Sequence, residues 1–198
     1  MVVGITGGIG TGKSLVSKAF CLLDNTVYYH ADEEAKSLMN TSLVIKNKII
    51  EVFGEDSYQK NKLNRKYISS FVFKDPKLLK RLNRIVHPIV KKHFINFVKK
   101  QNKNTFIIYE NAILFETGSN LVCDIVISVN APKNLRVKRV MERDHVSEKQ
   151  VLGRMKNQWP NIKRNLLSNY IVYNIEKEET LLKINYIYKI LTKKILLT

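Results

Sequence analysis

The segment GGIGTGKS at residues 7–14 constrains this chain more than any other feature, because of its residues and its neighbours. It satisfies the pattern G-x-x-x-x-G-K-[ST] in every position, an apolar strand-like run precedes it, and a helical pattern follows it. Glycines let backbone N–H groups approach an anion without a Cβ in the way, and a helix N-terminus adds positive charge at the same point. The segment therefore predicts a phosphate-binding loop between a strand and a helix.

Two other interpretations of the segment fit less well. A dinucleotide-binding turn starting at Gly8 would need glycine where Lys13 stands, and a flexible tail has no need of a flanking strand and helix. We therefore expect a nucleoside triphosphate site, in which Lys13 reaches the β and γ phosphates and the Ser14 hydroxyl holds Mg²⁺. The residues expected to contact the nucleotide are Gly8, Gly10, Thr11, Gly12, Lys13, Ser14 and Leu15.

The pattern of apolar residues predicts an α/β fold built of βαβ units. Short β-branched or aromatic runs, typical of parallel strands buried on both faces, lie at 2–6, 26–29, 105–109 and 124–129. Helical spacing is found at 13–23, 43–53, 76–100, 133–143, 148–157 and 178–197. The last of these is amphipathic and is expected to pack on the sheet, and Asp75 is expected to cap the helix that begins at Pro76.

Changes in the spacing of apolar residues indicate how a single domain is divided into a core, a lobe and a lid. The segment 33–100 is mostly helical with no obvious buried strand, which predicts a helical lobe inserted after the second strand. The core is then about 1–32, 101–135 and 160–198, and an arginine-bearing helical hairpin at 136–159 is expected to form a lid.

Composition excludes several classes of protein. The 34 Lys and Arg against 17 Asp and Glu give a formal charge of +17, but the cations are spread along the chain and no nucleic-acid-binding motif is present, so we expect no nucleic acid partner. No apolar run approaches the roughly 20 residues of a membrane span and no secretory signal is visible, so a cytoplasmic protein without a membrane partner is expected. Cys21 and Cys123 are expected to be core thiols rather than a disulfide or metal site.

The acidic residues point to a small-molecule kinase. The GTPase patterns N-K-x-D and D-x-x-G are absent from the sequence. A carboxylate beside an acceptor hydroxyl can orient it and accept its proton. Of the six aspartates, Asp32 directly follows the second predicted strand, at the sheet edge where ligands of open parallel sheets bind. Glu110 closes the third predicted strand, where it either approaches Mg²⁺ through water or bonds to backbone.

Three arginines favour a lid over the transferred phosphate. Arg139 and Arg143 lie four residues apart on one predicted helical face, and Arg154 follows after a turn. Such residues can supply charge and exclude water, although an exposed hairpin with solvated cations would show the same spacing.

Taken in order, the motifs resemble those of the dephospho-CoA kinase family over nearly the full length of the chain. They are GITGGIGTGKS at 4–14, ADEEAK at 31–36, HPIV at 87–90, AILFE at 112–116 and RVMERDHVSEKQVLGRMKNQ at 139–158. The resemblance implies a three-layer P-loop kinase fold of the α/β class, with a parallel sheet, a helical substrate lobe and a helical lid. It also implies phosphorylation of the ribose 3′-hydroxyl of dephospho-CoA with ATP and Mg²⁺, giving coenzyme A and ADP.

The resemblance also assigns residues. It implies that Asp32 is the base, and that the groups acting in catalysis or contacting substrate are Asp32, Lys13, Arg139, Arg143, His87 and Glu116. From chemistry alone, His87 would be a core or pre-proline histidine. The chain departs from the family at Ala112, where proline is frequent, and after Asn174, where no glycine follows, so no adenine contact is assigned.

Other functions give different expectations. A second P-loop metabolite kinase, of the nucleoside monophosphate or shikimate type, would accept its own substrate and leave dephospho-CoA unchanged. A nucleic-acid-binding P-loop protein would bind RNA or DNA with a steep salt dependence and show no kinase turnover. We expect a monomer or weak homo-oligomer.

Overall fold

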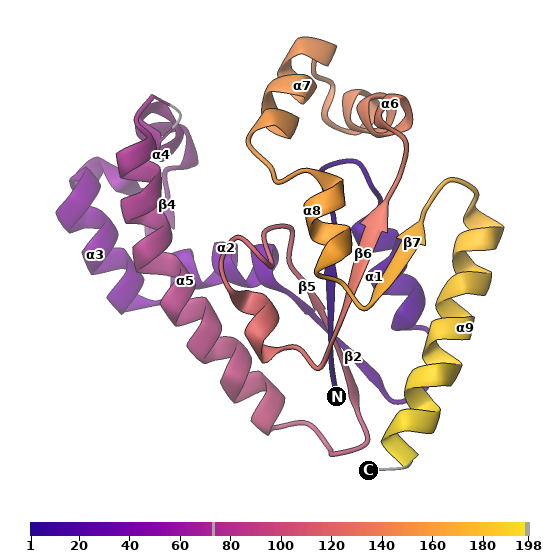
Figure 1. Ribbon diagram of the computed structural model, residues 1–198. Coiled ribbons are helices and arrows are strands. Elements are labelled where there is room, and N and C mark those ends of the chain that lie inside the picture. Colours follow the sequence, from indigo (N-terminus) through magenta and orange to yellow (C-terminus); the bar gives the residue numbers. More distant parts are fainter. Residues whose placement is uncertain (73, 197–198) are drawn as a thin grey trace. The chain divides into compact units, whose positions relative to one another are not determined.

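The structure, a computed structural model, describes residues 1–72 and 74–196. Its main element is a five-stranded sheet in which all neighbouring strands are parallel, in the order β2-β5-β1-β6-β7 (Figure 1). The strands are β1 (Val2–Thr6), β2 (Thr26–His30), β5 (Phe106–Glu110), β6 (Ile125–Asn130) and β7 (Tyr170–Tyr173). Every residue of β1, β5 and β6 is buried, which explains why these strands are continuous apolar runs in the sequence.

The strand register brings three carboxyl ends together at one edge of the sheet. Ile5 of β1 and His30 of β2 both lie opposite Glu110, the last residue of β5. The loop that follows β1 therefore begins beside Glu110, at the edge where open parallel sheets bind their ligands.

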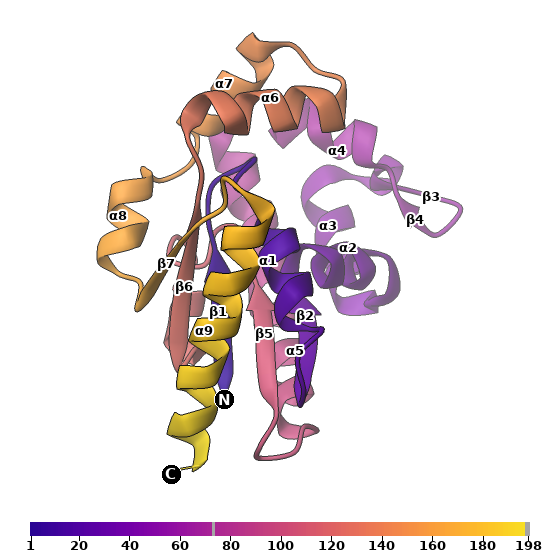
Figure 2. The same ribbon diagram turned by 90° about the vertical axis from the view of Figure 1, so that its right-hand side faces the viewer.

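Five α-helices belong to the same compact unit as the sheet: α1 (Lys13–Phe20), α6 (Lys133–Asp144), α7 (Glu148–Lys156), α8 (Asn161–Leu166) and α9 (Lys177–Leu196). A short 3-10 turn, η2 (Ser119–Val122), follows β5. Helices α1 and α9 pack against each other beside the sheet (Figure 2). Their apolar side chains join those of the strands in the main core, which confirms that the predicted amphipathic helix packs there.

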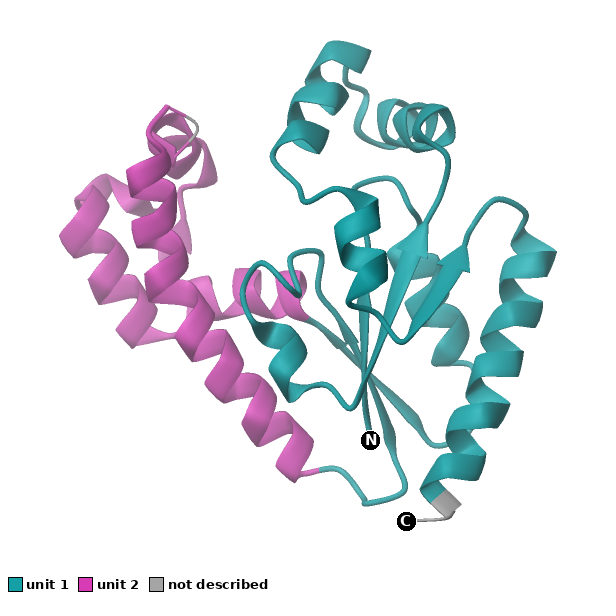
Figure 3. Cartoon of the chain, viewed as in Figure 1, with its two compact units in different colours: residues 1–30, 101–198 teal, residues 31–100 magenta. Residues whose placement is uncertain are grey.

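Residues 31–100 form a second compact unit (Figure 3). It contains α2 (Ala31–Thr41), α3 (Leu43–Phe53), a 3-10 turn η1 (Glu55–Ser57), the antiparallel strands β3 (Tyr58–Gln59) and β4 (Lys62–Leu63), α4 (Arg65–Val72) and α5 (Pro76–Lys99). Ile45 and Ile49 of α3 pack with Val86 and Val90 of α5 in a core of its own. The Asp75 carboxylate accepts from the Lys77 N–H at 2.7 Å, so the predicted helix cap is confirmed.

Differences from the predicted elements are mostly at their ends. The helix predicted at 13–23 ends at Phe20, where the chain turns toward β2, and the strands at 26–29, 105–109 and 124–129 end one residue later. Strand β7 and helices α2, α4 and α8 were not predicted individually. Residues 73, 197 and 198, which the predicted lobe, terminal helix and core include, lie outside the described residues.

Both cysteines are free thiols. Cys21 packs against the main core. Burial, reinforced by the nearby Glu110 carboxylate, raises its pKa to about 11, and burial with Asp124 raises the pKa of Cys123 to about 12. Neither thiol is ionised near neutral pH, so neither has the character of a reactive cysteine.

Candidate active site

The loop between β1 and α1 has the form of an anion cradle. Gly12, the residue before α1, has φ +86°, and a Cβ there would overlap the Asn174 side chain, so only glycine fits. Thr11 closes the turn by donating from Oγ1 to the Gly8 carbonyl at 2.9 Å. Within the described part of the chain, the backbone N–H groups of Gly10, Gly12 and Ser14 have no acceptor. These donors, at the positive end of α1, can bind phosphate oxygens.

The Lys13 ammonium folds back over this loop. Nζ donates to the Gly7 carbonyl at 2.9 Å and to the Gly8 carbonyl at 3.3 Å. A phosphate oxygen is a stronger acceptor than a carbonyl oxygen, because its negative charge strengthens the hydrogen bond. Lys13 is therefore held at the rim of the cradle, ready to exchange these carbonyls for phosphate.

Ser14 connects the loop to a buried carboxylate on β5. Its Oγ donates to Glu110 Oε1 at 2.8 Å, and Tyr28 of β2 donates from its hydroxyl to Oε2 at 2.5 Å. His30 Nε2 lies 3.5 Å from Oε1. Glu110 is 3% exposed, so these contacts replace the water that an ionised carboxylate would otherwise bind.

The electrostatics of this cluster keep Glu110 ionised. Burial alone would raise its pKa, but the hydrogen bonds from His30, Tyr28 and Ser14 outweigh burial and lower the pKa to about 2. Burial and the same carboxylate raise the pKa of Tyr28 above its ordinary range, so Tyr28 remains a donor. From the sequence, Glu110 was expected either to approach Mg²⁺ through water or to bond to the backbone. In the structure, its hydrogen-bond partners are side chains of the loop and of β2.

Arg139 lies on α6 and contacts the segment that follows β7. Its Nη1 donates to the Asn174 carbonyl at 2.9 Å and its Nη2 to the Ile175 carbonyl at 3.4 Å. Asn174 is buried, and its Nδ2 donates to the Thr11 carbonyl at 2.9 Å. The segment after β7 therefore links Arg139 to the phosphate loop.

The other two arginines of the predicted lid share one carboxylate. Asp144, the last residue of α6, accepts from Arg143 Nε at 2.7 Å and from Arg154 Nη1 at 2.6 Å. Hydrogen bonding to Arg143, and then to Arg154, lowers the pKa of Asp144 to about 2 against the opposing effect of burial. Asp144 balances one of these two positive charges, and an anion that binds the guanidinium groups must compete with its carboxylate.

Asp32 and His87 lie in the second unit. Asp32 is exposed in the first turn of α2, directly after the chain leaves β2, and His87 is half-buried on α5. Burial lowers the pKa of His87, and the charge of Asp32 partly offsets this effect. The charge of Asp32 therefore acts on His87, and burial keeps His87 neutral at neutral pH.

Glu116 is placed by a buried arginine of α8. Arg164 is 1% exposed and donates from Nη2 to Glu116 Oε1 at 3.2 Å. The other oxygen, Oε2, is buried and has no partner within the part of the chain that the structure describes. A buried acceptor of this kind costs free energy until a donor reaches it, so Glu116 retains capacity for one hydrogen bond.

Comparison with known proteins decides the family. A sequence model of the dephospho-CoA kinase family matches residues 1–179. The chain belongs to the dephospho-CoA kinase family. The dephospho-CoA kinase of Porphyromonas gingivalis is 38% identical over 158 residues, which cover 80% of this chain and 77% of that protein. The dephospho-CoA kinase of Bacteroides fragilis is 33% identical over 172 residues, covering 87% and 83%. Membership makes the chain an ATP-dependent kinase that transfers phosphate to a hydroxyl.

Solved structures confirm the fold class. The protein TT1252 from Thermus thermophilus is 26% identical, with a TM-score of 0.83 over 98% of this chain and 97% of that one. Dephospho-CoA kinase from Campylobacter jejuni, 21% identical, has a TM-score of 0.63 over 97% of each chain. Shikimate kinase from Acinetobacter baumannii has a TM-score of 0.55 at 14% identity, over 98% and 94%, and so shares the fold alone.

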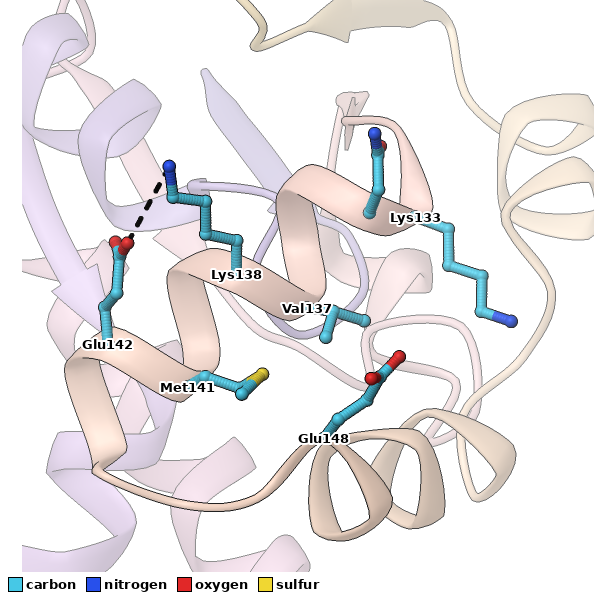
Figure 4. Close-up of a pocket in the computed structure, with 7 residues that line it drawn as sticks. Lys133, Val137, Lys138, Met141, Glu142 and Glu148 are labelled. Carbon is cyan, nitrogen blue, oxygen red and sulfur yellow. Dashed lines mark ion pairs between the residues drawn. The ribbon is translucent and has the colours of Figure 1, made fainter.

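A pocket of about 520 Å³ lies on α6 beside the start of α7 (Figure 4). Val137 and Met141 form its apolar part, Glu148 stands across from them, and Lys138 forms an ion pair with Glu142 at 4.0 Å. None of the loop residues 7–14 lines it, so we do not assign the nucleotide to this pocket.

Neither a metal-binding cluster nor a membrane-spanning helix is found among the described residues. Across residues 1–72 and 74–196, no group of three His, Cys, Asp or Glu side chains is arranged to hold a metal ion. In the same residues, every helix is too short or too polar to cross a membrane.

Several contacts of the site were not predicted from the sequence, and each spans a long sequence separation. Arg136 and Gln158 contact Ile9 of the loop. Tyr28 contacts Glu110, and Arg164 contacts Glu116. A partial signal was present for one of them, because Arg136 stands one helical turn before Arg139. The others are identified only once the sheet order is known.

Proposed function

We propose that the chain transfers the γ-phosphoryl group of ATP to the ribose 3′-hydroxyl of dephospho-CoA, giving coenzyme A and ADP. The observation that carries this proposal concerns the loop that follows β1. Among the described residues, several backbone N–H groups of this loop have no acceptor, and the Lys13 ammonium lies against the same loop. Dephospho-CoA is assigned as the acceptor because the chain belongs to the dephospho-CoA kinase family and resembles the dephospho-CoA kinases of two bacteria.

The proposed chemistry assigns a proton acceptor and a charged cradle. The 3′-hydroxyl oxygen forms a bond to the γ phosphorus while the bond from that phosphorus to the β–γ bridging oxygen breaks. Asp32 accepts the hydroxyl proton, and ADP leaves with the bonding electrons. The N–H groups of the loop and Lys13 stabilise the charge on the phosphate oxygens. His87 and Glu116 are proposed to contact the acceptor substrate.

The residues present fit Mg²⁺ as the metal of the reaction. The Ser14 hydroxyl stands at the start of α1 and donates its proton to ionised Glu110, which leaves its lone pairs free for a cation. Mg²⁺ commonly takes few protein ligands and keeps several waters together with substrate phosphates. We propose that Ser14 holds it directly and Glu110 through water. When bound, the ion supplies neutralising charge at the β and γ phosphates.

The arginines of α6 are proposed to act on the transferred phosphate. Arg143 is held by Asp144 and Arg139 by two carbonyls, so each has acceptors that a phosphate oxygen can replace. Exchange of these partners for phosphate would add positive charge only when the triphosphate is in place.

Substrate specificity tests the proposal. Purified protein with ATP and Mg²⁺ is given dephospho-CoA, AMP, CMP or shikimate in parallel, and ADP release is followed by a coupled assay. We expect turnover with dephospho-CoA that exceeds the others by orders of magnitude. Turnover of AMP, CMP or shikimate with none of dephospho-CoA would assign another metabolite kinase activity instead.

A further inference from the structure

Two side chains from outside the phosphate loop hold both backbone polar groups of Ile9. The Ile9 N–H donates to Gln158 Oε1 at 2.8 Å, and the Ile9 carbonyl accepts from Arg136 Nε at 2.9 Å. Arg136 lies on α6 and Gln158 follows the end of α7 by two residues. Ile9 is therefore held between a residue in the first turns of α6 and a residue just after the end of α7.

The same guanidinium shapes the neighbouring residue of the loop. A Cβ at Gly8 would overlap the Arg136 guanidinium, so a larger residue here would displace that side chain from its present position. Arg136 also donates from Nη1 to Asn161 Oδ1, a longer contact of 3.4 Å. Its side chain is therefore buried and held by hydrogen bonds to the loop and to α8, which distinguishes it from a solvated surface arginine.

The charge of Arg136 has no carboxylate to balance it. Arg164 is paired with Glu116, whereas Arg136 contacts only neutral oxygens among the described residues and is 9% exposed. Burial and the neighbouring Arg164 lower its pKa from the ordinary value. An unbalanced buried charge is costly, and a bound triphosphate would supply the missing negative charge.

We propose that Arg136 and Gln158 are positioning residues for the triphosphate, which clamp Ile9 so that the N–H groups of the loop face the phosphates. Arg136 additionally places a fixed positive charge behind the loop. This inference rests on the proposed use of ATP, and it is independent of which hydroxyl accepts the phosphate. Neither residue touches the reacting atoms in this account, since both act through the backbone of Ile9.

Direct binding of a non-hydrolysable ATP analogue with Mg²⁺, measured by calorimetry, tests the clamp. Arg136→Gln removes the charge and the guanidinium group that approaches Gly8, and we expect the Kd to rise about tenfold or more. Gln158→Met leaves the Ile9 N–H without its acceptor and should raise the Kd about tenfold.

Two further variants separate the clamp from simple stabilisation. If both residues act on one loop conformation, the double variant Arg136→Gln/Gln158→Met should lose less affinity than the product of the two single losses. Lys189→Gln, which removes an exposed cation from α9, is the charge control and should bind within about twofold of wild type. In turnover assays, the KM for ATP should change more than kcat, because the lost interaction acts on binding.

The following results would overturn the proposal. Folded Arg136→Gln and Gln158→Met proteins with the wild-type Kd, even if their Tm is lower, would show that the two residues only stabilise the fold. If the double variant loses affinity by the full product of the two single losses, Arg136 and Gln158 act separately. If Arg136→Gln does not fold, Arg136→Lys is tested instead, because it keeps the charge but lacks the planar guanidinium group. Its Kd for the ATP analogue must then be about threefold higher than that of wild type. If the wild-type protein binds the ATP analogue normally but does not turn over dephospho-CoA, the result counts against the proposed acceptor and not against the clamp.

Discussion

The Ser14 hydroxyl donates to Glu110 Oε1 at 2.8 Å, which ties the first turn of α1 to the end of β5. Because the proton points to the carboxylate, the lone pairs of the hydroxyl oxygen are directed elsewhere, as a metal ligand requires. Hydrogen bonds from His30 and Tyr28, together with the one from Ser14, lower the pKa of Glu110 and keep it ionised, so that both of its oxygens accept.

Acid stability should depend on Glu110. Its pKa is about 2 in the folded chain, below the ordinary value of 4.5, so its contribution to stability is complete above pH 4.5 and is lost as the pH falls toward 2. That shift corresponds to about 3 kcal/mol as an order of magnitude. Urea unfolding across this pH range should show a steeper loss for wild type than for Glu110→Gln. Parallel pH profiles for the two proteins would contradict the assignment.

Asp32→Asn should lower kcat by about 10²-fold or more while ATP binding stays nearly unchanged, because an amide cannot accept the hydroxyl proton. Asp24→Asn makes the same chemical change at an exposed turn residue and should leave kcat unaltered. Steady-state kinetics with dephospho-CoA give the comparison. Full activity in Asp32→Asn would remove Asp32 from the mechanism.

Lys13→Ala should weaken both ATP binding and transfer, with kcat/KM lower by about 10²-fold or more, because the cradle loses its one mobile cation at the loop. Lys18→Ala, on an exposed position of the same helix, serves as the control and should stay within about twofold. Kinetics as a function of ATP concentration distinguish the two variants, and equal values for both would refute the cradle.

Gly12→Ala and Gly153→Ala should change stability in opposite directions. At Gly12 the backbone has φ +86° and a Cβ would overlap Asn174, so the free energy of unfolding should fall by more than about 1 kcal/mol. At Gly153, inside α7, a Cβ would meet nothing, and alanine should stabilise by roughly 0.5–1 kcal/mol. Chemical denaturation measures both, and a stabilised Gly12→Ala protein would mean that the loop is not held as described.

The fold could be predicted from the sequence wherever one local pattern determines the element. Strand β1 and helix α3 have the predicted bounds, because an apolar run after the first residue and a helical repeat ending at Gly54 are both unambiguous. Strand β7 was missed because four residues between Asn169 and Asn174 give too short a pattern. Its place beside β6 depends on pairing that no local signal carries.

The candidate site was predictable only in part, for the same reason. The loop residues follow from the spacing of glycines with Lys13 and Ser14. The contacts that hold the loop come from Arg136, Gln158 and Asn174, which are distant from it in the sequence. The role of Asp144 in holding two arginines could not be read from the sequence, because it depends on the packing of α6 against α7.

The most direct test of the central claim follows the phosphoryl group itself. ATP labelled in its γ-phosphoryl group is incubated with dephospho-CoA, Mg²⁺ and the protein, and the product is treated with a 3′-nucleotidase. The account predicts that the label enters coenzyme A, that the nucleotidase releases it, and that Lys13→Ala transfers little of it. Label that appears only as inorganic phosphate, or that stays on coenzyme A after the nucleotidase, would contradict the account.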